Sequence, residues 1–183
     1  MAEVSSATKR TTSSSVFVNG WTYIFLNRPD TDYIDFFKFK RPADAKNSRG
    51  ECGAKDGRLE ARPGPLSALV FSDNSIRLYY TGPGKAGGDP VLREAKLANA
   101  GSDNADPSKD WLKPGPANKE LAFESDIGWK TRTIDALSFV SASTRIDEDQ
   151  NNKAVASVTY KAAGDDYFQY TYQSKNGWAS LKL

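Results

Sequence analysis

The stretch LSALVFSDNSIRLYYTGPGKAGGDPVLREAKL, residues 66–97, decides the expected fold. It contains three runs rich in aliphatic, aromatic and β-branched residues, and the residues between the runs include the turn formers Ser, Asp, Asn, Gly and Pro. Runs of this composition separated by turns are typical of β-strands that follow one another in a sheet. We therefore predict a three-stranded up-and-down meander with strands at 66–71, 75–81 and 91–97.

The third run has a helical alternative. Asp89, Pro90 and Gly101 would serve as the cap, the first position and the stop of a helix over 91–100. Periodicity taken alone favours that helix slightly. On these residues by themselves, both interpretations stay open.

Further strand-like runs lie on either side of this stretch. VFVNGWTYIFLN and YIDFFKFK, separated by residues 28–32, predict a hairpin before it. Residues 41–64 are predicted to be a loop, and 98–128 a second one, long enough to be functional or loosely ordered. The expected strand runs outside 66–97 are 16–27, 33–40, 133–142, 153–162, 166–174 and 177–183.

The groups of strands open alike, which indicates a weak internal repeat. SALVF (67–71) is similar to DALSF (135–139), RLYY to ASVTY, and LREAKL to YFQYTY. Repeats of this kind are typical of radial β-propeller blades, and a β-sandwich is the alternative. The predicted fold class is all-β, with up-and-down meanders forming about three propeller blades.

Length and composition narrow the class of protein. A chain of 183 residues favours one domain, placed at 15–183 after a disordered N-terminal arm, 1–14, rich in Ser, Thr and Ala. Lysine and arginine number 25 against 23 acidic residues, so the chain lacks the basic excess that nucleic acids require. No apolar run approaches the ~20 residues that cross a bilayer, and no membrane partner is expected.

The start of the chain and its single cysteine favour the cytoplasm. The segment MAEVSSATKRTTSSS lacks the apolar centre of a secretory signal, and Cys52 has no partner for an internal disulfide. Arg49, Lys55 and Arg58 lie near Cys52 in sequence and favour a lowered thiol pKa. Because no partner base accompanies the thiol, we interpret it as a spectator.

The chain contains no histidine. This excludes Ser-His-Asp and Cys-His catalysis as well as histidine-ligated zinc. Asp147, Asp149 and Asn151 imitate the start of a calcium loop, but Val158 stands where the bidentate glutamate should be. A paired-carboxylate glycosidase needs only two acidic residues, yet nothing selects a pair. We therefore expect neither a metal nor a cofactor.

The string S-A-L-V-F-x-D-N-S-I-R-L-Y-Y (67–80), followed by V-L-R-E (91–94) and later Gly-Trp pairs, resembles the blade signature of the fungal fucose-specific lectin family. The full run occurs once and covers less than a third of the chain. The resemblance implies a β-propeller and makes 91–97 a strand. It also implies that the chain binds fucose or a similar saccharide.

The resemblance further implies a sugar site between adjacent blades. Arg77 of the second strand would donate to sugar oxygens, Glu94 of the third strand would accept from hydroxyls, and an aromatic ring of the neighbouring blade would pack on the sugar. Trp129 and Trp178, from the two Gly-Trp pairs, are the candidate rings. Tyr79 completes the candidate set.

The other two groups depart from the family pattern. Thr22 and Asp35 stand near the arginine and glutamate positions in the first group, and Ser157 and Gln169 in the third. The resemblance thus leaves at most one sugar site per chain. Because three blades are too few to close a ring and the family typically has six, it implies a homodimer that forms one six-bladed propeller.

Other functions are compatible with the same residues. Arg77 and Glu94 would form a cross-strand ion pair on a solvated face if they bind nothing. Some fungal proteins with this lectin-like fold are cyclases (pericyclases) of secondary metabolism, and such an enzyme would hold an apolar small molecule in the propeller cavity. An interaction protein that uses residues 98–128 is the third possibility.

Overall fold

The computed structural model describes residues 11–84, 90–113, 139–147, 150–151, 153–161, 164, 168–174 and 177–183. Within these residues the chain contains β-strands, one short 3-10 helix and no α-helix. The predicted all-β class is therefore confirmed. No helix in this part of the chain is long and apolar enough to cross a membrane.

The described strands form three four-stranded antiparallel sheets, each hydrogen-bonded in chain order as an up-and-down meander. The first sheet contains β1 (Thr12–Val18), β2 (Trp21–Asn27), β3 (Ile34–Phe39) and β4 (Arg49–Glu51). The second contains β7 (Leu66–Val70), β8 (Ile76–Gly82), β9 (Val91–Leu97) and β10 (Trp111–Leu112). The third contains β11 (Val140–Asp147), β12 (Lys153–Lys161), β13 (Phe168–Ser174) and β14 (Gly177–Lys182). The 3-10 helix η1 (Pro42–Asn47) follows β3, and β5 (Gly53–Ala54) pairs with β6 (Gly57–Arg58).

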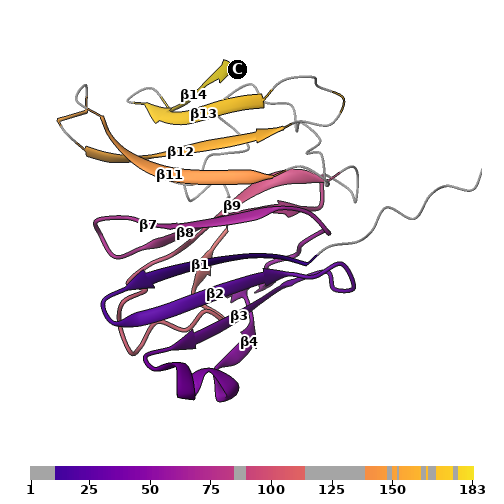
Figure 1. Ribbon diagram of the computed structural model, residues 1–183, viewed down its shortest axis with the longest axis vertical. Helices are drawn as coiled ribbons and strands as arrows, with labels where there is room; N and C mark the ends of the chain where they lie inside the picture. The colour runs from indigo at the N-terminus through magenta and orange to yellow at the C-terminus, as the bar shows by residue number, and fades with distance from the viewer. Residues whose placement is uncertain are drawn as a thin grey trace, which may run out of the picture.

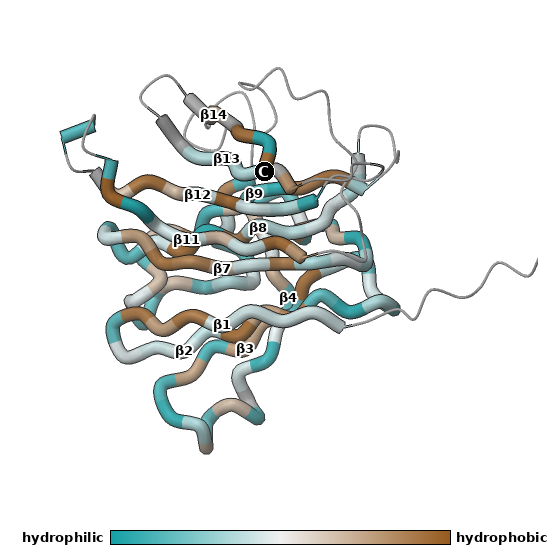
Figure 2. Tube along the Cα trace, turned by 45° about the horizontal axis from the view of Figure 1, so that its top comes forward, coloured by the Kyte–Doolittle hydropathy of each residue, from teal (hydrophilic) through white to brown (hydrophobic). Residues whose placement is uncertain are grey.

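The three sheets are stacked with the second sheet in the middle (Figure 1). Neighbouring sheets approach most closely through their first strands, because β7 lies beside β1 on one side and beside β11 on the other. Figure 2 shows hydrophobic residues in β1 and β7, where the first and second sheets meet. Side chains alternate along a strand, so the middle sheet buries one face against each neighbour.

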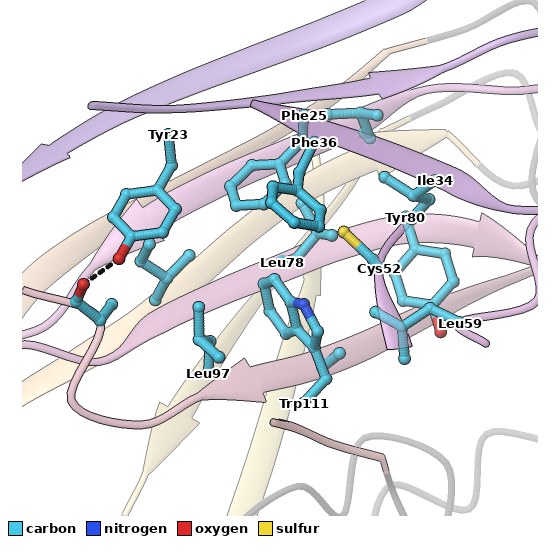
Figure 3. Close-up of a cluster of buried hydrophobic side chains, with 14 of the residues drawn as sticks. Tyr23, Phe25, Ile34, Phe36, Cys52, Leu59, Leu78, Tyr80, Leu97 and Trp111 are labelled. Carbon is cyan, nitrogen blue, oxygen red and sulfur yellow. Dashed lines mark hydrogen bonds between the residues drawn. The ribbon is translucent and has the colours of Figure 1, made fainter. Parts of the chain in front are cut away.

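The larger core lies between the first and second sheets (Figure 3). The Tyr23 hydroxyl donates a hydrogen bond to the Ala100 carbonyl, and the Phe25 ring meets the Trp111 ring edge-on with centroids 5.6 Å apart. Cys52 joins this core from the segment after β4. Tyr23, Phe25 and Phe36 of the first sheet thus belong to this core.

The second core lies between the second and third sheets. Its buried side chains come from strands of both sheets, for example Tyr79 from β8 and Val158 and Tyr160 from β12. The third sheet turns its opposite face away from the other two sheets. The full buried set is Leu69, Phe71, Tyr79, Leu92, Val140, Ala156, Val158 and Tyr160.

A hydrogen bond between first strands recurs at both sheet contacts. The Ala68 backbone N–H donates to the Ser14 hydroxyl at 2.9 Å, joining β7 to β1. The Ala142 backbone N–H donates to the Ser67 hydroxyl at 3.1 Å, joining β11 to β7. Ser14 and Ser67 both accept this bond, and Ala68 and Ala142 both donate it. The two bonds therefore identify equivalent positions in the three sheets.

One strand-like run differs from its predicted form, and the strand predicted at 91–97 is confirmed. The run 16–27 is a tight hairpin, β1–β2, and not one strand. Asn19 and Gly20 turn the chain with φ of 47° and 82°, the positive values that a two-residue hairpin turn requires and that Asn-Gly supplies. Residues 91–97 form strand β9, which pairs with β8 from Val91 to Leu97, so the helical alternative is wrong.

Other boundaries also move. β1 begins at Thr12, inside the segment expected to be the disordered arm, and residues 1–10 lie outside the described part. The segment expected to be a loop after β9 includes β10 at Trp111–Leu112. Its remainder from residue 114 lies outside the described residues, as do 133–138 of the strand expected at 133–142. β11 instead runs from Val140 to Asp147.

Candidate functional site

The structure brings three of the five predicted site residues together. Tyr79 and Glu94 are paired residues of β8 and β9, and Arg77 lies on the same face of β8. Nη1 of Arg77 lies 2.5 Å from Oε1 of Glu94, and the Tyr79 hydroxyl donates to the same oxygen at 3.2 Å. This face of the second sheet is the one that meets the third sheet.

The cluster is buried, contrary to the alternative of a solvated ion pair. The side chain of Glu94 has no exposed surface, and that of Arg77 is 8% exposed. Burial raises the pKa of Glu94 above its ordinary value, and the charge of Arg77 acts in the opposite direction. Burial also raises the pKa of Tyr79 well above its ordinary value, so this hydroxyl stays protonated and can donate.

Phe71 is a member of the cluster that the sequence did not single out. Its ring lies 4.7 Å from the Arg77 guanidinium carbon and packs against the cation. Phe71 ends the SALVF run, where it was interpreted only as a strand residue. A signal for its role was present, because Phe71 follows Leu69 at the two-residue spacing that places both on one face of a strand.

One carboxylate oxygen of the cluster accepts no hydrogen bond within the described residues. Among the described residues, no hydrogen-bond donor reaches Oε2 of Glu94. A buried acceptor without a partner is rare in native proteins, because its desolvation is not compensated. The cluster therefore holds one carboxylate oxygen that could accept a bond from a further donor.

Of the two sequence-based counterparts of Arg77, the one in the first sheet is wrong by one residue. Leu69 pairs with Arg77 in the second sheet, and the two serine hydrogen bonds align Leu69 with Val16 and Ser143. Val16 pairs with Tyr23, and Ser143 with Ser157. Tyr23, not Thr22, is therefore the counterpart of Arg77 in the first sheet, and Ser157 is confirmed as the counterpart in the third.

The counterparts of Glu94 shift in the same way. Glu94 lies opposite Tyr79, and the matching pairs are Phe25 with Phe36 and Thr159 with Tyr170. Phe36 and Tyr170 thus replace the expected Asp35 and Gln169. Asp35 lies on the opposite face of β3, where it forms ion pairs with Arg28 at 2.8 Å and Arg49 at 3.2 Å.

Neither of the two predicted tryptophan side chains belongs to the described part of the chain. Trp129 lies outside the described residues. The backbone of Trp178 lies in β14 opposite Gln173, and its side chain is likewise outside the described part. The aromatic ring that the resemblance implied for the sugar therefore stays a prediction.

Cys52 and Asp147, which the sequence analysis also considered, lie in surroundings that indicate structural roles. Cys52 is fully buried in the larger core, and burial raises the pKa of its thiol well above the ordinary value, so the neighbouring cations do not lower it. Asp147 accepts a hydrogen bond from Gln150 at 2.6 Å and pairs with Arg145. In the described part of the chain, no three His, Cys, Asp or Glu residues are grouped to hold a metal ion.

Comparisons with known proteins add little. No protein-family model and no curated protein sequence matches this chain. One solved structure similar to it is Zg3597, a family 117 glycoside hydrolase of the marine bacterium Zobellia galactanivorans. The similarity covers 93% of this chain and 67% of that one, with 14% sequence identity and a TM-score of 0.34. A TM-score this low carries no inference about this chain.

Proposed function

We propose that this chain is a lectin-like carbohydrate-binding protein that recognises fucose or a similar saccharide through Arg77, Tyr79 and Glu94. The proposal interprets the three meanders as propeller blades and the cluster as the polar part of a sugar site between two of them. The observation that carries it is the buried carboxylate oxygen of Glu94 that has no donor among the described residues.

The chemistry of the cluster suits a polyol. A sugar hydroxyl would donate to Oε2 of Glu94, which supplies the bond that this oxygen lacks. Charge-assisted hydrogen bonds of this kind are stronger than neutral ones, and a planar guanidinium beside the carboxylate offers several fixed donors to sugar oxygens. The buried setting strengthens each of these bonds relative to water.

The counterpart positions restrict the site to one per chain. Tyr23 and Phe36 in the first sheet, and Ser157 and Tyr170 in the third, cannot reproduce a guanidinium and a carboxylate. We therefore expect one saccharide per chain at saturation. A titration that gave two or three equal sites would contradict this assignment.

A glycan array followed by calorimetric titration with free fucose tests the proposal. The isosteric Glu94→Gln variant should weaken binding roughly tenfold or more, because it removes a charged acceptor. Tyr79→Phe should weaken it less. The matched control is Tyr80→Phe, which removes a hydroxyl from the next residue, on the opposite face of β8. The proposal fails if the array is silent, or if all three variants bind fucose as the parent does.

A second candidate is favoured by the aromatic counterparts. Tyr23 and Phe36, which pack in the larger core, and the half-buried Tyr170 occupy positions where a multivalent lectin would repeat its polar ligands. Aromatic side chains at these positions suit a small hydrophobic molecule, as in the cyclase alternative. Native mass spectrometry of freshly purified protein separates the two functions. A copurified apolar ligand together with a silent array would favour the cavity function over the lectin function.

A further inference from the structure

Within the part of the chain that the structure describes, the two end sheets of the stack each leave an apolar face without a neighbour. The outer face of the first sheet contains Phe17, which is 67% exposed, and the half-buried Ile24, Leu26 and Phe37. Pairing places these residues opposite the face that packs on the second sheet. Exposed apolar patches of this kind mark sites of association.

The outer face of the third sheet is aromatic. Phe139 and Phe168 are 47% and 37% exposed, and their ring centroids lie 5.1 Å apart. The half-buried rings of Tyr170 and Tyr172 stack beside them at 5.9 Å. These residues lie on the face turned away from the second sheet, because Thr159, opposite Tyr170, alternates with the core residues Val158 and Tyr160.

The recurring serine hydrogen bond indicates which partner can pack against these two faces. Ser14 and Ser67 each accept a backbone N–H from the first strand of the following sheet. By the same alignment, the third serine of this series is Ser141, one residue before Ala142. The matching N–H donor in the first sheet belongs to Ser15, one residue after Ser14. Both Ser141 and Ser15 are exposed.

We propose that the third sheet of one chain packs on the first sheet of a second copy, with the Ser141 hydroxyl accepting a hydrogen bond from the Ser15 N–H of the second copy. The contact repeats the one that already joins the sheets within the chain. It places the aromatic outer face of the third sheet on the apolar outer face of the first. A second copy fits better than another partner because both halves of the repeating contact occur on this one chain.

The stack also suggests that two copies close on themselves. The contacts between neighbouring sheets are concentrated in β1, β7 and β11. In a radial arrangement about an axis near these strands, a second copy would continue the series, and its third sheet would return to the first sheet of the first copy. The two-fold pair would then form the same contact twice and leave no outer face exposed, whereas a rotation that failed to close would give an open filament.

Solution mass with a charge substitution is the first test. The full chain should have twice its mass of 20.1 kDa by light scattering. Ile24→Arg should shift the mass to that of one chain, because an arginine on the outer face of the first sheet is buried without a partner in the dimer. Leu112→Arg, at an exposed apolar residue of β10 away from both faces, is the matched control and should remain dimeric. A parent of single-chain mass overturns the proposal.

Cysteine cross-linking tests the register of the contact. Ser15 and Ser141 lie at opposite ends of the stack in one chain, so the double variant Ser15→Cys, Ser141→Cys should form a covalent dimer under mild oxidation. Each single variant alone should not, but a mixture of the two should. Cys52 is buried and does not compete. Absence of the cross-link in a dimeric double variant, or a ladder of larger species, would overturn the proposed closed pair.

Discussion

The guanidinium of Arg77 and the carboxylate of Glu94 form an ion pair across β8 and β9, with Nη1 and Oε1 2.5 Å apart, in the contact between two sheets. Such a pair is costly to desolvate, and its presence in a sheet contact that apolar residues would fill needs a reason. The proposed saccharide binding would supply one. The pair also makes clear predictions about stability that do not depend on any ligand.

Removal of one partner of the ion pair should lower the free energy of unfolding. Arg77→Ala leaves the Glu94 carboxylate buried without its cation, which typically destabilises a protein by about 3–5 kcal/mol. Denaturant unfolding measures the difference. The control is Arg41→Ala, which breaks the Arg41–Asp44 pair at 3.1 Å on a side chain that is 81% exposed. Loss of that surface pair should cost less than about 1 kcal/mol. Equal effects of the two substitutions would show that Arg77 and Glu94 are not buried as described.

The raised pKa of Glu94 predicts a pH dependence of a definite sign. A carboxyl whose pKa is higher in the folded state binds its proton more tightly there, so its contribution to stability is largest at low pH and is lost as the pH rises from the ordinary value of 4.5 through the raised one. The glutamine side chain of the Glu94→Gln variant cannot ionise. The variant should therefore gain stability relative to the parent as the pH rises through this window.

Paired urea unfolding curves at a series of pH values measure that gain. The free energy of unfolding of Glu94→Gln, minus that of the parent, should become more positive as the pH rises above 4.5. Carboxyls with lowered pKa, such as Asp73 and Asp106, occur in both proteins and cancel in the comparison. A difference that stays constant or falls across the window would mean that the pKa of Glu94 is not raised.

The sequence predicts the Arg77–Glu94 contact but not its setting. Alternating residues on adjacent strands are brought together by any antiparallel meander, so the spacing within residues 66–97 is sufficient for the pair. Burial depends on the third sheet, which comes from residues far along the chain. No local pattern in SIRLYYT says which face of β8 that sheet will cover, and for this reason a solvated pair remained an alternative.

The register of the strands is the second feature that limits prediction from the sequence. An alignment that is wrong by one residue moves a side chain to the other face of its sheet. Thr22 and Asp35 were chosen by such an alignment, whereas strand pairing places Tyr23 and Phe36 on the face equivalent to that of Arg77 and Glu94. The Asn19–Gly20 turn fixes this register, and its positive φ values are readable from sequence.

Cys52 should be unreactive in the native protein. Its side chain is fully buried in the core between the first and second sheets, and burial raises its thiol pKa, so both access and thiolate are lacking. A thiol reagent such as DTNB should label it only at the rate of unfolding. The single variant Ser72→Cys provides a comparison, since its added thiol lies at an exposed position in the turn between β7 and β8, outside the proposed dimer contact. Rapid labelling of Cys52 without denaturant would contradict the burial.

Lys38 should hold the loop after β9 in place. Its ammonium group donates to the carbonyls of Ser102 at 3.1 Å and Ala105 at 2.5 Å, and lies 4.3 Å from the centre of the Trp21 ring. Lys38→Met keeps the apolar stem but removes the donor. Because hydrogen bonds to a charged group contribute about 1.5–3 kcal/mol each, the substitution should destabilise the protein by an amount of this order.

Lys40 offers a close control for this prediction. Its ammonium group also lies over Trp21, at 4.7 Å, but it is half exposed and pairs with the exposed Asp103. Lys40→Met should therefore cost less than about 1 kcal/mol. Hydrogen exchange distinguishes anchoring of the loop from a general loss of stability, since Lys38→Met should raise exchange at the Ala105 N–H, which is bonded within the loop to Ser102, more than in the strands of the third sheet. Uniformly faster exchange in all three sheets would mean that Lys38 stabilises the fold as a whole and does not anchor this loop.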